Sequence, residues 1–228
     1  MAQEVYWWRR KKKKGAQPKP PRNPNKQYKT DPYPVVMRLD CPDKVFFTSD
    51  THFGEDRVLQ LSSRPFSCVE EMDRELIQRW NDTVPEDGIV FHLGDFGFKN
   101  YPRGHELLRI LHGKKYLILG NHDQERMCRG HAEMFEGVSQ QMNINVDGQR
   151  IFLNHCPLLC FPDETNKTWQ LFGHVHSGPL NNRGYDLQRL PFLLPGQYDV
   201  GVDNNDFRPV RFEQIRSIIN AQRNKLLG

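Results

Sequence analysis

Short apolar runs separated by amphipathic segments begin near Val35 and continue to the end of the chain. The segments 44–49, 88–93 and 115–119 each centre on consecutive apolar residues, which predicts buried strands. Apolar residues recur at helical spacing in 67–80 and 105–112, which predicts amphipathic helices, with Ser67 capping the first. Strand and helix therefore alternate through the first half, as expected of an α/β domain with layers packed face to face.

The second half is richer in predicted strands. The segments 141–146 and 149–153 flank Asp147-Gly148, a strong hairpin turn signal. Further strands are expected at 168–172 and 197–202, and an amphipathic helix at 212–227.

No run reaches the roughly 20 apolar residues of a membrane span. The five cysteines show no CxxC spacing, which argues against a disulfide scaffold and favours a reducing, cytoplasmic setting.

The charge is divided unevenly along the chain. Residues 1–30 hold ten Lys/Arg against Glu4, a net +9, whereas the remaining residues carry −5. This division predicts a flexible, basic, Pro-rich tail at 1–34 and a single domain at 35–228. The run 9–14 would attract nucleic acid or another anionic surface. A merely solubilising arm explains the same run, and the sequence leaves both interpretations open.

Polar side chains follow the predicted strands, at the point where each strand ends. In open α/β sheets, ligands bind in the crevice outside the carboxyl ends of the strands, so these side chains are expected to converge. The residues with metal-binding side chains at these positions are Asp50, His52, Asp95, Asn121, His155, His174 and His176.

The types of donor narrow the choice of occupant. Imidazoles mixed with carboxylates and an amide suit Mn, Fe, Zn or Ni better than Ca or Mg. Seven donors exceed one tetrahedral site but suit two ions that share a carboxylate, an arrangement that serves in-line phosphoryl displacement. The sequence therefore predicts a dinuclear centre, with manganese as the first choice.

The order of these motifs resembles the calcineurin-like metallophosphoesterase superfamily. The shared motifs are Asp50-x-His52, Gly94-Asp95, Gly120-Asn121-His122-Asp123, His155 and Gly173-His174-x-His176. The resemblance spans residues 45–176, and Gly201-Val202-Asp203 is similar to a later part of small bacterial and phage members. It implies a four-layer α/β/β/α sandwich.

The resemblance also implies a role for each residue. One metal would be bound by Asp50, His52, Asp95 and His176, and the second by Asp95, Asn121, His155 and His174. A metal-bridging hydroxide would attack phosphorus, while His122 would donate to a phosphate oxygen or protonate the leaving group. Asp123 would either orient His122 or cap the following helix.

Departures from the family pattern narrow the function. The Asp-Arg-Gly motif of Ser/Thr protein phosphatases is missing after Asp95, which disfavours that class. Glu55 replaces a histidine common in the bacterial subgroup. Arg57 and Arg64 are expected at the solvated surface, with contact to a substrate phosphate as the alternative. His92 is expected in a structural role. The leading hypothesis is a phosphoesterase acting on phosphodiesters or small phosphorylated molecules. The alternatives are a nuclease guided by the basic tail and a non-catalytic metal-binding scaffold.

Overall fold

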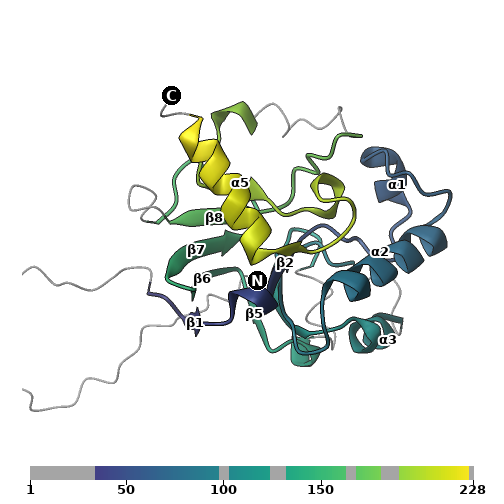
Figure 1. The fold of residues 1–228 in the computed structure, drawn as a ribbon. Helices are drawn as coiled ribbons and strands as arrows, with labels where there is room; N and C mark the ends of the chain where they lie inside the picture. Colours follow the sequence, from purple (N-terminus) through teal and green to yellow (C-terminus); the bar gives the residue numbers. More distant parts are fainter. Residues whose placement is uncertain (1–33, 98–102, 124–131, 163–167, 181–189, 226–228) are drawn as a thin grey trace, which may run out of the picture. The chain divides into compact units, whose positions relative to one another are not determined.

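The computed structural model describes residues 34–97, 103–123, 132–162, 168–180 and 190–225 (Figure 1). Contacts divide the chain into Met1–Pro32 and Tyr33–Gly228, and the fold described below belongs to the second part. The predicted basic tail, except Pro34, lies outside the described residues.

Two five-stranded sheets form the fold. The first sheet contains, in spatial order, β10 (Val210–Arg211), β2 (Val45–Thr48), β3 (Ile89–His92), β4 (Lys114–Ile118) and β5 (Gly137–Ser139). The strands β2 to β5 are parallel, and β10 pairs antiparallel with β2. The second sheet contains β1 (Met37–Leu39), β6 (Gln141–Val146), β7 (Gln149–Asn154), β8 (Trp169–Phe172) and β9 (Gln197–Asp199).

The second sheet combines a hairpin with parallel strands. β6 and β7 pair antiparallel across Asp147 and Gly148, whose φ angles of 48° and 80° are both left-handed, as a type I′ turn requires. The strands β7, β8 and β9 are parallel. The predicted hairpin is therefore confirmed.

The helices agree with the apolar periodicity, with small differences at their ends. They are α1 (Arg57–Leu61), α2 (Val69–Thr83), α3 (Arg103–Ile110) and α5 (Phe212–Asn224). The cap of α2 is Cys68 rather than Ser67, whose backbone N–H donates instead to Glu71 at 2.7 Å. The sequence did not indicate α1, β1, β5 or β10, because elements of two to five residues are too short to show a period.

The core places the sheets and helices relative to one another. Phe46 in β2 packs with residues of α2 and α3, whereas its neighbours Val45 and Phe47 pack with residues of the second sheet, including Ile151 and Leu171. Because successive strand residues point to opposite faces, the two sheets share one core while α2 and α3 cover the other face of the first sheet. In Figure 1, α2 and α3 lie together, away from α5.

The sheets also meet at one end. Ser49, just after β2, forms a parallel bridge with Gly201, which follows β9. This bridge brings the carboxyl ends of the parallel strands of both sheets to the same place. Among the described residues, no helix is long and apolar enough to cross a membrane.

Candidate metal centre

The seven predicted donors all lie at the carboxyl ends of parallel strands. Asp50 and His52 follow β2, Asp95 follows β3 and Asn121 follows β4 in the first sheet. In the second sheet, His155 follows β7, whereas His174 and His176 follow β8. The backbone N–H of His174 donates to both oxygens of Asp50, at 2.9 and 3.0 Å, which links the two sets.

Three donors gather on one side of the centre. Asp50, His52 and His176 each offer one atom within 4.8 Å of the others, and all three residues are mostly buried. His176 Nε2 lies 3.9 Å from Asp50 Oδ1. The rings of His52 and His176 stack with centroids 5.2 Å apart.

The other donors gather around Asn121. Its Oδ1 lies 3.0 Å from His155 Nε2 and 3.0 Å from His174 Nδ1. Asp95 Oδ2 lies 3.4 Å from the same nitrogen of His155. The structure thus brings the predicted second set together.

Asp95 lies between the two groups. Its Oδ2 is 3.6 Å from His52 Nε2 as well as 3.4 Å from His155 Nε2. Asp50, Asp95 and His155 also offer three atoms within 4.8 Å of one another. One carboxylate can therefore contact donors of both groups.

Three of the four candidate imidazoles share an orientation typical of metal ligands. His155 Nδ1–H donates to the Leu93 carbonyl at 2.7 Å, and His176 Nδ1–H donates to Asp203 at 2.7 Å. His52 Nδ1 lies 3.4 Å from the carboxylate of Glu55. Metal-binding histidines usually place the second ring nitrogen against such an oxygen, which fixes the tautomer and turns the other nitrogen to the ion.

The donor spacing fits a metal ion. Ligand bonds of about 2.1 Å in a tetrahedral shell separate the ligand atoms by roughly 3.4 Å. The pairs given above lie 3.0 to 3.9 Å apart. Both ring nitrogens of His52 are buried and make no hydrogen bond within the described part of the chain. A cation bound by Nε2 would satisfy one buried atom that otherwise lacks a partner.

Strained backbone is concentrated at the donors. Asp50, His52, Asp95, His174 and His176 all have φ angles between 49° and 72°. Residues other than glycine rarely adopt this backbone region, and each one that does costs on the order of 1 kcal/mol of folding free energy. Backbone strain of this kind clusters at functional sites, which is where the surrounding fold retains it.

Two motif glycines are required by close packing. A Cβ on Gly120 would lie 2.2 Å from Asp95 Oδ1, and a Cβ on Gly94 would lie 2.5 Å from the backbone nitrogen of Gly120. The Gly-Asp and Gly-Asn motifs therefore need glycine because the two strand ends approach each other too closely for any side chain.

The pKa values of Asp95 and His155 are shifted because the carboxylate and the imidazole are buried in contact with each other. Burial opposes ionisation of Asp95, yet the hydrogen bond and charge of His155 hold the pKa of Asp95 below its usual range. Burial also disfavours a charged His155, but Asp95 and Asp50 raise its pKa to about 9. A bound divalent ion would replace this proton as the partner of the carboxylates.

His122 and Asp123 have different environments. His122 is exposed at the mouth of the centre; its backbone N–H donates to Asp95 Oδ1 at 2.9 Å, and its ring lies 5.3 Å from that of His52. Asp123 is buried, and its carboxylate accepts the backbone N–H groups of Asp95, Phe96 and Gly120 at 2.8 to 3.0 Å. The carboxylate of Asp123 therefore fixes the two loops that carry Asp95 and Asn121.

The prediction that Arg64 lies at the solvated surface is wrong. Its side chain is fully buried and forms two hydrogen bonds of 2.9 Å with Asp203. It also donates to the backbone carbonyls of Asp50 and Thr51, at 2.6 and 2.9 Å. Burial would raise the pKa of Asp203, but Arg64 and His176 hold it below its usual range.

Asp203 had a sequence signal, because Gly201-Val202-Asp203 belongs to the family resemblance, but no spacing rule connects it with Arg64 or His176.

His92 is buried as expected: its Nε2–H donates to Thr51 Oγ1 at 2.9 Å while Nδ1 accepts the Gly94 N–H at 3.3 Å. Burial lowers the pKa of His92 to about 3, so the ring is neutral.

Comparisons with known proteins place the chain among uncharacterized relatives. No family model matches it. The Gene 66 protein of Mycobacterium phage L5 is 29% identical over 167 residues, which cover 60% of this chain and 80% of that protein. The Gene 66 protein of Mycobacterium phage D29 is 26% identical over 205 residues, which cover 77% and 96%.

A solved structure supports the fold. The crystal structure of the protein of unknown function AQ665 from Aquifex aeolicus matches 76% of this chain and 98% of its own, with a TM-score of 0.58 and 24% identity.

The uncharacterized protein MJ1445 of Methanocaldococcus jannaschii is 31% identical over 180 residues, which cover 77% of this chain and 91% of that protein. The chain therefore belongs to the same family as MJ1445.

Proposed function

We propose that this chain is a dinuclear metal-dependent phosphoesterase that hydrolyses phosphodiesters or small phosphorylated molecules, with diesters favoured. The observation that carries the proposal is the common orientation of His52, His155 and His176. Each turns Nε2 toward Asp50 or Asp95 and Nδ1 toward a second oxygen. That arrangement is typical of metal ligands.

Two ions are proposed because the donors form two groups that share Asp95. One ion would take Asp50, His52, Asp95 and His176, and the other would take Asp95, Asn121, His155 and His174. Manganese is the first choice, with iron, zinc or nickel compatible with the same ligands. The core shared by the two sheets, with α2 and α3 on the outer face of the first, supports three layers of the α/β/β/α architecture implied by the family resemblance. The buried residues of α5 pack in the core between the sheets, so the fourth layer rests on the resemblance alone.

The chain's own residues have distinct tasks in this proposal. Bound divalent ions would supply positive charge for the phosphoryl oxygens and acidify the attacking water. Asp95 contacts donors of both ligand groups, and its position depends on the hydrogen bonds that its loop donates to Asp123. Among the described residues, His122 is the exposed imidazole nearest the centre, so its ring can donate a proton to a phosphate oxygen or to the leaving group.

Initial rates on bis-p-nitrophenyl phosphate and p-nitrophenyl phosphate test the proposal. The full chain is treated with a chelator and then reloaded with Mn²⁺. Turnover should require metal, and His122→Ala should lower kcat by about 100-fold or more, the usual contribution of a general acid. Asp206→Asn is the matched control for Asp95→Asn, because the Asp206 side chain is 72% exposed and pairs with Arg79 away from the centre.

The outcomes separate the candidate functions. Wild-type turnover in Asp95→Asn and His122→Ala would contradict the assigned mechanism. Metal binding without turnover of either ester would favour a non-catalytic scaffold. A preference for the monoester would contradict the diester assignment while leaving the phosphoesterase proposal intact.

Nucleic acid is the second candidate substrate, supported by the net +9 of residues 1–30. A chain that lacks residues 1–30 should bind DNA or RNA more weakly and with a flatter dependence on salt, because fewer counterions are released. An unchanged salt dependence would remove the support for this candidate.

A further inference from the structure

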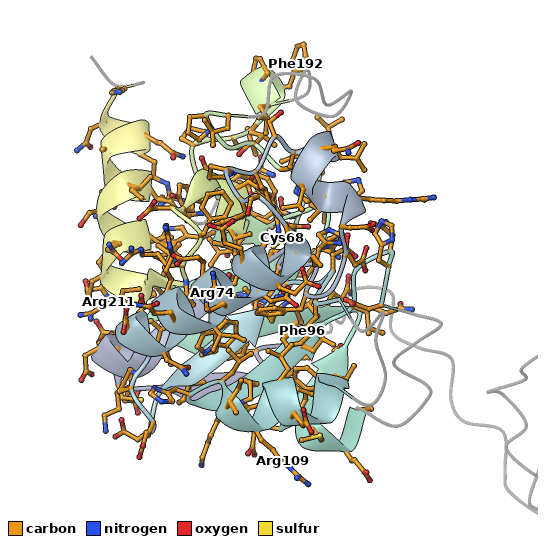
Figure 2. The ribbon with its side chains drawn as sticks, turned by 90° about the vertical axis from the view of Figure 1, so that its right-hand side faces the viewer. Cys68, Arg74, Phe96, Arg109, Phe192 and Arg211 are labelled. Carbon is orange, nitrogen blue, oxygen red and sulfur yellow. The ribbon has the colours of Figure 1, made fainter. Side chains whose placement is uncertain are left out.

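Two apolar segments next to the candidate metal centre expose an unusual amount of hydrophobic surface. Residues 156–162, after β7, and 190–195, before β9, consist of apolar residues, prolines and cysteines and contain no charged side chain. Leu159 and Phe192 leave 82% and 74% of their surface exposed. Figure 2 shows Phe192 at the edge of the molecule. Clustered apolar surface of this kind marks binding sites more often than isolated exposed residues do.

A pocket lies between the two segments. Its volume is about 380 Å³, within the range of about 300–1,000 Å³ that small-molecule sites occupy. Leu158 and Leu159 line it from the first segment, and Phe192 and Leu193 line it from the second. His174, a candidate metal ligand, forms another part of the wall, so the pocket borders the candidate centre.

Two buried glutamines fix the backbone of both segments. Gln170 in β8 and Gln197 in β9 are in register with each other, and the two side chains are hydrogen-bonded. Gln170 accepts the N–H of Leu158 at 3.1 Å, while Gln197 donates to the Leu158 carbonyl at 2.9 Å and accepts the N–H of Leu194 at 2.7 Å. The pocket is therefore built before any ligand arrives, which lowers the entropic cost of binding.

We propose that this pocket binds the apolar aryl or alkyl group that stays on the phosphate, rather than the leaving group, while the phosphate lies at the candidate metal centre. The inference rests on the proposed function, since His174 would contact the metal next to the phosphate. The described lining offers leucine, proline and phenylalanine side chains with no charged group, so it would bind an apolar ring or chain better than a sugar or an anion.

The kinetic test compares two diesters with the same leaving group, methyl p-nitrophenyl phosphate and phenyl p-nitrophenyl phosphate, on the Mn²⁺-loaded full chain. We expect Phe192→Ala and Leu159→Ser to lower kcat/KM for the phenyl ester by about tenfold or more and to leave the methyl ester within about twofold, given the usual worth of apolar pocket contacts. Ile110→Ala on α3 is the matched control, an exposed apolar residue outside the pocket. Comparing variant with wild type for each ester cancels their different intrinsic reactivities.

A binding measurement tests the pocket proposal independently of the phosphoesterase proposal. Calorimetric titration of the metal-loaded chain with phenylphosphonate and methylphosphonate should show tighter binding of the phenyl compound, and Phe192→Ala should abolish the difference. Selective phenyl binding without turnover of any ester would support the pocket and contradict the phosphoesterase. Turnover with equal effects of the variants on both esters, or equal binding of both phosphonates, would overturn the pocket proposal. Self-association of the chain that Phe192→Ala abolishes, without selective phenyl binding, would overturn it in favour of a protein contact.

Discussion

The substitution Asp203→Asn isolates the buried carboxylate behind His176. In the structure, Asp203 accepts His176 Nδ1–H at 2.7 Å and two Arg64 N–H groups at 2.9 Å. Asparagine keeps the shape but removes the negative charge and one of the two accepting oxygens. The His176 ring then loses the group that selects its tautomer and increases its basicity toward a metal.

The effect on metal affinity follows from this contact. Substituting such an outer partner typically costs 10- to 100-fold in affinity, about 1.4 to 2.7 kcal/mol. Stability should fall as well, because the fully buried Arg64 side chain would lose its only ionic partner among the described residues. Leaving one member of a buried pair uncompensated costs about 3–5 kcal/mol of unfolding free energy.

A double variant separates these two effects. In Arg64→Met/Asp203→Asn no unpaired charge remains, so part of the lost stability should return. Metal affinity should stay low, because His176 still lacks its carboxylate. The pair of Arg79 and the exposed Asp206 provides the control, and Asp206→Asn should change the unfolding free energy by less than about 1 kcal/mol.

The assay combines calorimetric titration of chelator-treated protein with Mn²⁺ or Zn²⁺ and unfolding in urea. An Asp203→Asn variant that is destabilised but binds metal with wild-type affinity would refute the positioning role of Asp203. Recovery of both stability and affinity in the double variant would show that the affinity loss reflected a weakened fold.

Two further predictions concern acid stability and packing. The folded-state pKa of His92, about 3, lies below its usual 6.5, so its contribution is fully present above pH 6.5 and is lost as the pH falls toward 3. In His92→Gln, urea unfolding at pH 7 to 4.5 should show lower stability at neutral pH but a shallower decline, by up to about 1.4 kcal/mol per pH unit; an unchanged slope would contradict the buried neutral ring. Gly120→Ala would place a Cβ 2.2 Å from Asp95 Oδ1, so metal titration should show a loss of at least about tenfold in affinity, whereas Gly148→Ala, with open space around the Cβ, should retain wild-type affinity despite its strained turn.

The sequence alone determined much of the fold. The apolar runs located β2, β3, β4, β7 and β8, and the Asp147-Gly148 turn located the hairpin, because these signals are local. The positions of the candidate ligands were also predictable, since each follows a strand and carboxyl ends of strands gather at one edge.

Only the tertiary structure decided what supports those ligands. Arg64 and Asp203 are 139 residues apart, and Glu55 was noticed only as a departure from a family pattern, yet Asp203 and Glu55 lie against the Nδ1 atoms of His176 and His52. No period or motif in the sequence encodes such contacts, because they depend on how two sheets meet at Ser49 and Gly201. For the same reason a buried arginine was assigned to the surface: burial of a charge depends on a partner that only the folded chain provides.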